Sequence, residues 1–201
     1  EPGEGKSTTI CNLGVVLAQN GTKVIIADCD LRHPRIHKYF GLTNRHGFSF
    51  LFAQPDEALD GALQTTAIRR LSIITTGSLP PNPAELLGSQ KMQKLLTAMR
   101  ADSDIILVDT PPVLAVTDAA VLAASMDGVL IVVEPGKTRM SALRLTLEKL
   151  QQVNARILGV VLNDVDLRSQ PYNYRYHYYR NYSAYQHYYG GKEDNVVKKE
   201  G

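Results

Sequence analysis

The chain has 201 residues, a length that corresponds to one domain with room for an appendage. Its 44% hydrophobic content allows a sizeable core, and its net charge of +2 is too small to argue for nucleic acid or an anionic membrane as the partner. Two cysteines exclude a secreted disulfide scaffold, so Cys11 and Cys29 are expected to be buried thiols. No apolar run reaches the ~18 residues of a membrane helix. Residue 1 is not methionine, so we interpret the chain as a fragment.

Helical and strand patterns alternate along the chain. The expected strands are continuous apolar runs, which is typical of a parallel sheet covered by helices on both faces. We therefore predict an α/β three-layer fold with a mainly parallel sheet. In chain order the elements are a helix over 6–19, strands at 24–28 and 71–75, a helix starting at 82–85, strands at 105–109 and 129–133, a helix after 138 and a strand at 157–162.

Each expected helix has a start signal or an apolar stripe. The first carries Ile10, Leu13 and Leu17 on one side. In the second, Asn82 can cap, Pro83 suits the first helical position and Glu85 can reach back to the cap. Thr138 can cap the third. The inward positions expected in the last two helices are Met92, Leu95, Leu96 and Met99, and Met140, Leu143, Leu147 and Leu150.

The composition changes near Asp166. Beyond it almost no aliphatic side chains follow, and nine of the ten tyrosines fall between 172 and 189. Such a segment cannot build a core of its own. We therefore predict a nucleotide-binding domain over 1–166 and a flexible tyrosine-rich tail over 167–201.

The first eight residues match the end of a Walker A phosphate loop, G-x-x-x-x-G-K-[ST], whose first glycine would precede Glu1. Glycines let backbone N–H groups approach phosphates, Lys6 neutralises their charge and the Ser7 hydroxyl suits Mg²⁺. The alternative is a glycine turn before an ordinary helix. The predicted phosphate-binding residues are Gly3, Glu4, Gly5, Lys6, Ser7 and Thr8.

The strand that normally feeds such a loop would lie upstream of Glu1, in the middle of the sheet. The hypothesis follows that this chain folds less stably, or binds nucleotide more weakly, than one extended upstream.

Three aspartates end predicted strands. Asp109 ends an apolar strand, as in a Walker B motif, where the carboxylate holds Mg²⁺ directly or through water. Asp28 and Asp30 are spaced by two, so on an extended strand end their carboxylates point the same way. One can hold Mg²⁺ while the other orients a hydroxyl and takes its proton. The alternative for this pair is a solvated turn with one carboxylate capping a backbone N–H.

Basic and amide side chains nearby leave alternatives open. Arg32, Arg35 and Lys38 contact phosphate or an acidic neighbouring subunit, or form a solvated basic face. Asn163, after the last strand, is placed for an amide contact to the adenine base, or is a turn residue.

Taken together, these motifs resemble the bacterial tyrosine kinases of capsule and exopolysaccharide export. The resemblance covers nearly the whole chain, and its most specific parts are 79–87, Leu-Pro-Pro-Asn-Pro-Ala-Glu-Leu-Leu, and the tyrosine cluster. It also includes segments 2–7, 28–34, 108–112 and 159–163.

The resemblance implies a P-loop fold and ATP and Mg²⁺ as ligands. Asp28 would be the partner of the tyrosine hydroxyl, with Asp30 and Asp109 on the metal side. It also implies a ring of copies in which one tail enters its neighbour's site, a transmembrane activator or fused N-terminal membrane segment, and a place at the cytoplasmic face of the inner membrane, where such kinases control polysaccharide export.

The tail is the expected autophosphorylation substrate, because an unfolded segment threads into a site at little cost. The phosphates added to it would repel one another, which would release the tail from a neighbouring copy. Stacking on single-stranded nucleic acid or sugars is the competing interpretation, as is an extension without function. The acceptor tyrosines would be Tyr172, Tyr174, Tyr176, Tyr178, Tyr179, Tyr182, Tyr185, Tyr188 and Tyr189.

Two other functions share the phosphate loop. A partition or division-site ATPase would carry a signature lysine after the first glycine, where this chain has Glu1 and no such lysine. A nucleotide-binding adaptor without phosphotransfer would not need the intact set of Lys6, Ser7 and the three aspartates.

Overall fold

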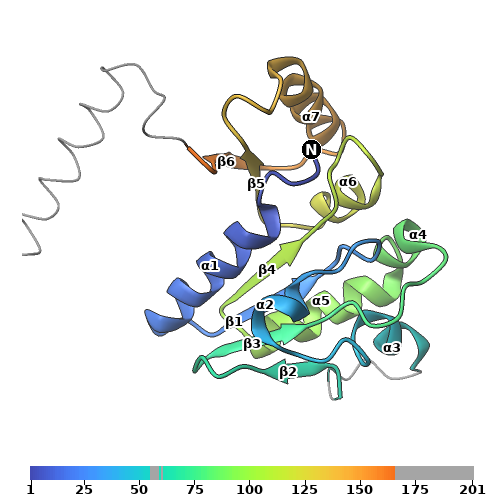
Figure 1. The fold of residues 1–201 in the computed structure, drawn as a ribbon. Helices are drawn as coiled ribbons and strands as arrows, with labels where there is room; N and C mark the ends of the chain where they lie inside the picture. Colours follow the sequence, from blue (N-terminus) through green and yellow to red (C-terminus); the bar gives the residue numbers. More distant parts are fainter. Residues whose placement is uncertain (55–58, 60, 166–201) are drawn as a thin grey trace, which may run out of the picture. The chain divides into compact units, whose positions relative to one another are not determined.

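The computed structural model describes residues 1–54, 59 and 61–165 (Figure 1). Its helices and strands all belong to the unit Glu1–Asp164. The tyrosine-rich segment lies outside the described residues, so its flexibility and the domain boundary at 166 stay predictions.

Helices and strands alternate through this unit, as the sequence predicts. They are α1 (Lys6–Gln19), β1 (Val24–Asp28), α2 (Ile36–Phe40), α3 (Phe48–Ala53), β2 (Leu63–Thr65), β3 (Leu71–Ile74), α4 (Pro83–Leu87), α5 (Gln90–Asp102), β4 (Ile105–Asp109), α6 (Asp118–Ala123), β5 (Val129–Val133), α7 (Met140–Gln152) and β6 (Ile157–Leu162).

The strands form a four-stranded sheet of order β2-β3-β1-β4 and a two-stranded sheet of β5 and β6. β1 runs parallel to β3 and β4, and β5 runs parallel to β6. β2, a three-residue strand that the sequence analysis missed, pairs antiparallel with β3 at the edge. The mainly parallel α/β fold is therefore confirmed.

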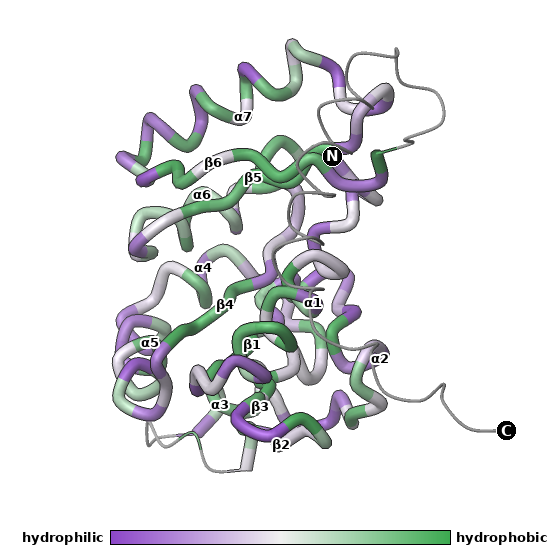
Figure 2. Tube along the Cα trace, turned by 90° about the vertical axis from the view of Figure 1, so that its left-hand side faces the viewer, coloured by the Kyte–Doolittle hydropathy of each residue, from purple (hydrophilic) through white to green (hydrophobic). Residues whose placement is uncertain are grey.

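Helices cover both faces of β1, which is buried along its whole length. Ile25 and Ala27 pack in the cluster that holds residues of α3 and α5, whereas Val24 and Ile26 pack in the cluster that holds residues of α1 and α2. Figure 2 shows β1 and β4 hydrophobic along their lengths. This two-sided burial explains why the strands read as continuous apolar runs.

A cavity of about 650 Å³ lies between β4 and β5, which do not pair with each other in the described part of the chain. The expected apolar stripe of α1 lines this cavity and is half-buried, with Ile10 and Leu17 packed against the core that holds β1 and β3. The buried positions of α1 are Cys11, Gly14 and Ala18.

The helix expected from Asn82 is two helices. α4 ends at Leu87, and α5 begins after Ser89, whose hydroxyl accepts a hydrogen bond from the backbone N of Met92 at 3.2 Å. Asn82 does not cap α4 with its side chain; its amide instead donates to Glu85 Oε2 at 2.7 Å. The predicted stripe at 92–99 is buried, but it belongs to α5.

The third expected helix is α7, which starts at Met140 with Arg139 at the N-cap. Thr138 is not the cap, and Met140 is 65% exposed rather than inward. Leu143, Leu147 and Leu150 pack inward as expected.

Two further expectations concern composition. Cys11 and Cys29 are buried free thiols, as predicted. Within the described ranges, every helix is too short or too polar to cross a membrane.

Candidate active site

The phosphate loop is a left-handed turn ahead of α1. Gly3 and Gly5 have φ of 80° and 81°, where side chains cause strain. A Cβ at Gly5 would lie 2.0 Å from Asn163 Nδ2, so this position accepts glycine alone. The backbone of the predicted loop therefore has a geometry that requires glycine at both positions.

Glu4 is the buried side chain of this loop, with 3% of its surface exposed. Thr138 Oγ1 donates to Glu4 Oε1 at 2.6 Å, and Asn163 Nδ2 donates to the Glu4 backbone oxygen at 3.0 Å. Residues that follow β5 and β6 thus hold the loop in place. The Asn163 amide braces the loop, and its contact to adenine stays a prediction.

Lys6 lies among carboxylates. Its Nζ donates to the Glu1 backbone oxygen at 2.6 Å and lies 3.8 Å from Glu4 Oε2. Burial lowers the pKa of Lys6, while the charges of Glu4, Asp109 and Asp30 oppose that shift. The ammonium is therefore in the electrostatic reach of both strand ends, as the motif predicts.

Ser7 and Asp109 meet directly: Ser7 Oγ donates to Asp109 Oδ2 at 2.6 Å. Asp109 is 3% exposed and lies in register with Asp28 across β4 and β1. Burial raises the pKa of Asp109 to about 6, against the opposing hydrogen bond from Ser7. The Walker A hydroxyl and the Walker B carboxylate are thus brought together from positions 102 residues apart.

Asp28 is fully buried at the end of β1. Its Oδ2 accepts hydrogen bonds from the backbone N–H groups of Arg35 (3.2 Å) and Ile36 (3.1 Å), whereas its Oδ1 has no partner. Burial, followed by the charge of Asp109, raises the pKa of Asp28 to about 7. A buried carboxylate oxygen without a donor is costly, so this unpartnered atom needs an explanation, and the role of Asp28 toward a hydroxyl stays a prediction.

Asp30 is partly exposed, and its Oδ1 accepts from the backbone N–H groups of Arg32 (3.2 Å) and His33 (2.9 Å). The capping turn considered from the sequence is therefore present. Asp30 still contributes charge to the site, since it acts on the pKa values of Lys6, Asp28 and Asp109.

The donor set fits a cation that arrives with phosphate. Mg²⁺ uses one or two carboxylates together with phosphate oxygens rather than an all-protein cage. Over residues 1–54, 59 and 61–165, no cluster of three or more His, Cys, Asp or Glu side chains is arranged to hold a metal. The Ser7 hydroxyl, Asp109 and the nearby Asp30 supply oxygen ligands of the kind that Mg²⁺ prefers.

Arg32 forms an ion pair within the chain, an arrangement that the sequence analysis did not consider. Its guanidinium binds Asp118 of α6 with two hydrogen bonds, Nε to Oδ2 at 2.9 Å and Nη2 to Oδ1 at 3.0 Å. Asp118 is fully buried. This pair fastens the loop after β1 to α6.

Two residues have supporting roles that the sequence analysis missed. Asp118 and Thr138 act through partners 86 and 134 residues away, and no local pattern encodes such a distance. The hydroxyl of Thr8 is hydrogen-bonded with Tyr39 Oη at 2.9 Å, and the contact of Thr8 to phosphate stays a prediction. The Thr138 signal, a capping type just ahead of an apolar stripe, was seen but assigned to the helix rather than to the loop.

Comparisons with known proteins agree with this geometry. Residues 2–188 match the ParA family model, described as NUBPL iron-transfer P-loop NTPase. The tyrosine-protein kinase YwqD of Bacillus subtilis is 37% identical over 98% of this chain and 77% of its own length. The tyrosine-protein kinase etk of Escherichia coli is 38% identical over 86% of this chain, which spans about a quarter (24%) of that relative.

Solved structures give the same picture. The kinase domain of Escherichia coli tyrosine kinase ETK superposes with a TM-score of 0.80 at 36% identity, covering 85% of this chain and 67% of that one. The septum site-determining protein MinD of Pyrococcus horikoshii, complexed with Mg-ADP, reaches a TM-score of 0.67 at 23% identity over 87% of this chain and 72% of that one. The second likeness concerns the fold alone.

Proposed function

Because the chain belongs to the P-loop family that includes the bacterial tyrosine kinases, we propose that it transfers the γ-phosphate of ATP to tyrosines of its own C-terminal cluster. The observation that carries the proposal is the unpartnered Oδ1 of buried Asp28, beside the Ser7–Asp109 pair. Burial keeps the pKa of Asp28 near 7, where a carboxylate can accept a proton.

The reaction needs one bond made and one broken. The tyrosine oxygen attacks the γ-phosphorus, and the bond from that phosphorus to the β,γ-bridging oxygen breaks, so that ADP leaves. The phenolic proton passes to Asp28 Oδ1. Since phosphoryl transfer proceeds through a loose transition state, positioning the hydroxyl matters more than the strength of the base.

The phosphate loop and Lys6 would hold the triphosphate, with backbone N–H groups and the ammonium neutralising its charge. Mg²⁺, held by Ser7, Asp109 and Asp30, would supply further neutralisation of the β- and γ-phosphates. Asn163 would fix the loop and thereby the nucleotide.

The acceptor would come from another copy, in a ring whose members exchange tails. The resemblance to capsule and exopolysaccharide kinases supports a transmembrane activator or fused membrane segment, attachment to the cytoplasmic face of the inner membrane and control of polysaccharide export. These partners and this place rest on that resemblance.

The test is incubation with Mg-ATP, followed by phosphotyrosine immunoblotting and measurement of ADP release. Wild type should gain tail phosphate. Lys6→Met should lose nucleotide binding and phosphate together, whereas Asp28→Asn should bind ATP normally but transfer phosphate about 10³-fold more slowly, because proton acceptance and orientation are lost. Lys149→Met, on α7, is the matched control and should resemble wild type.

Hydrolysis without phosphotyrosine would instead support the partition ATPase. Nucleotide binding with neither product would support the adaptor.

A further inference from the structure

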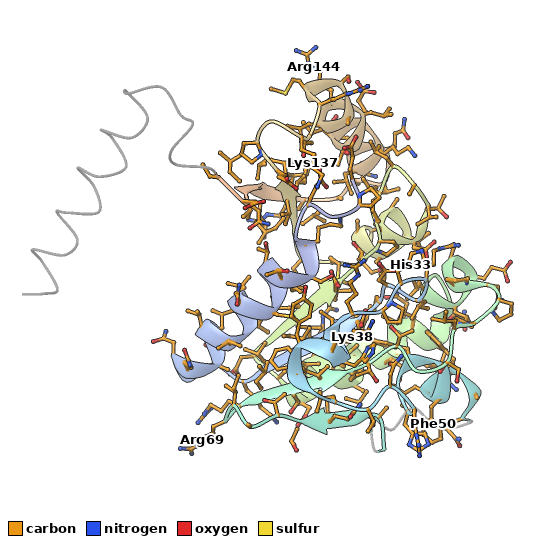
Figure 3. The ribbon with its side chains drawn as sticks, in the orientation of Figure 1. His33, Lys38, Phe50, Arg69, Lys137 and Arg144 are labelled. Atoms are coloured by element: carbon orange, nitrogen blue, oxygen red, sulfur yellow. The ribbon has the colours of Figure 1, made fainter. Side chains whose placement is uncertain are left out.

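A second cavity, of about 540 Å³, lies beside the candidate active site. His33, Pro34, Arg35, Lys38 and Tyr39 line it. They belong to the loop after β1 and to α2; Figure 3 labels His33 on the loop and Lys38 on the helix.

The cavity is cationic. Its lining includes Arg35 and Lys38 and no acidic residue. Both side chains are exposed, and neither forms an ion pair or a side-chain hydrogen bond with any described residue. Arg32, only three residues before Arg35, differs because Asp118 neutralises it. The charge in the cavity therefore stays available to an anion.

The cavity shares its backbone with the acceptor side of the active site. The N–H of Arg35 donates to Asp28 Oδ2, and the N–H of His33 donates to Asp30 Oδ1. Tyr39 Oη is hydrogen-bonded with Thr8, the neighbour of Ser7. An anion bound here would thus lie next to the group that is proposed to receive the tyrosine proton.

We propose that this cavity binds a phosphotyrosine already formed on the tail of a second copy, and so retains that tail while a neighbouring tyrosine is phosphorylated. This proposal rests on the proposed kinase function and adds the order in which the tail is modified. The ligand chemistry is an aryl phosphate dianion, which pairs with Arg35 and Lys38 while its ring lies against Pro34 and Tyr39.

The charge of the tail favours this order. Residues 167–192, which hold the nine clustered tyrosines, contain three arginines and one lysine but no aspartate or glutamate, so this part of the unmodified tail is repelled by the cavity. Each phosphate adds about −1.5 to −2 charges and reverses that interaction. The cavity therefore distinguishes a tail that has started to react from one that has not.

The spacing of the tyrosines matches the geometry. Tyr172, Tyr174, Tyr176 and Tyr178 follow one another at intervals of two. Two residues of extended chain span about 7 Å. This length suits the separation of the cavity from the active site, because Arg35, which lines the cavity, donates its backbone N–H to Asp28. A phosphotyrosine in the cavity would therefore place the next tyrosine, two residues along the chain, at the active site.

The first experiment measures binding directly, on the full chain without nucleotide. A synthetic peptide of residues 170–181 carrying phosphate on Tyr174 should bind at least 10-fold more tightly than the unmodified peptide. The Arg35→Ala/Lys38→Ala variant should lose that preference, whereas Arg69→Ala/Arg144→Ala, which removes two exposed cations elsewhere, should keep it (Figure 3 labels both control positions). Equal binding of the two peptides to wild type would overturn the proposal.

Two further measurements use the wild-type protein and therefore do not depend on whether the variant folds. In wild type, the phosphopeptide should shift the ring signals of His33 and Tyr39 in an NMR titration, and unshifted rings would contradict the site. Inorganic phosphate should compete only at much higher concentration than the phosphopeptide. Competition at equal concentration would mean that the cavity binds free phosphate and not the modified tail.

The second experiment follows the reaction by intact-protein mass spectrometry. Wild type should show unmodified and multiply phosphorylated chains with few intermediates, whereas the double variant should accumulate singly phosphorylated chains, raising their share at least 5-fold. An unchanged distribution would refute retention. Absence of any phosphotyrosine in wild type would refute the kinase function instead, and the peptide measurement would still decide whether the cavity binds a phosphotyrosine.

Discussion

The two sheets of this protein differ in how they are packed and in what they contribute to the site. In the larger sheet β1 is buried on both faces, and its end carries Asp28 in register with Asp109. In the smaller sheet β6 alternates between half-buried and exposed positions, with Leu158 58% and Leu162 51% exposed. The first sheet fixes the carboxylates, whereas the second supplies Thr138 and Asn163, which hold the phosphate loop.

The site is therefore assembled from a well-packed half and a half whose strands are more exposed. The cavity between β4 and β5 separates them, and two segments reach both sides. The phosphate loop and the start of α1 bond Thr138 on one side and Asp109 on the other. In α6, Leu122 packs in the core of the larger sheet and Ala123 packs in the core of the smaller sheet. Changes in the cavity should therefore affect the melting temperature, changes in the carboxylates the pH dependence of stability, and changes in the residues that hold the phosphate loop the nucleotide affinity.

Filling the cavity between β4 and β5, which separates the two sheets, should change the stability of the protein more than a change in the carboxylates or in the residues that hold the phosphate loop. A chain extended upstream of Glu1 by an apolar strand should melt about 10 °C higher, because a strand between β4 and β5 would bury the stripe of α1 and the half-buried face of β4, a net gain of about 3 kcal/mol. Differential scanning calorimetry of the two chains measures this difference. Equal melting temperatures would refute the hypothesis of a central upstream strand.

The well-packed half, which carries Asp28, should determine how the stability of the protein depends on pH. Asp28 has a folded pKa of about 7, above its ordinary value, so its protonation stabilises the fold at low pH and that contribution is lost as the pH rises from about 4 through 7. Without nucleotide, wild type should lose roughly 2 kcal/mol more than Asp28→Asn between pH 5 and pH 8. Urea titrations at both pH values test this, and parallel curves would contradict it.

The smallest effect should come from the hydrogen bonds by which Thr138 and Asn163 hold the phosphate loop. Thr138→Val removes the hydrogen bond to buried Glu4, so nucleotide affinity should fall about 5-fold, equivalent to about 1 kcal/mol, with little change in the pH dependence of stability. Thr97→Val on α5, which loses a local bond to the Gln93 backbone oxygen, is the control and should bind nucleotide as wild type does. Calorimetric titration with Mg-ADP distinguishes the two.

Much of the fold was predictable because buried strands leave a local signal. The apolar runs that became β1, β4, β5 and β6 were assigned with their observed bounds. The break between α4 and α5 was missed, since the apolar stripe continued past Gly88 and the capping Ser89 was not weighed. β2 has three residues, too few for a period to show.

The candidate site was predictable where a motif fixes the chemistry. Lys6, Ser7 and Asp109 were named from the sequence, and the structure brings them together. The supporting contacts were not predictable, because the Arg32–Asp118 pair and the Thr138–Glu4 bond depend on tertiary structure. The difference between Asp28, with one unpartnered oxygen, and Asp30, which caps a turn, likewise needed coordinates.

The bond from Asn163 to the phosphate loop has a mechanical consequence. Asn163 directly follows β6, and the tyrosine-rich segment continues from that end of the chain. A load applied to the C-terminus, by a binding partner or in an optical trap, would therefore act on the residue whose amide holds the nucleotide loop. Tension on the C-terminus should weaken nucleotide binding before it unfolds the larger sheet.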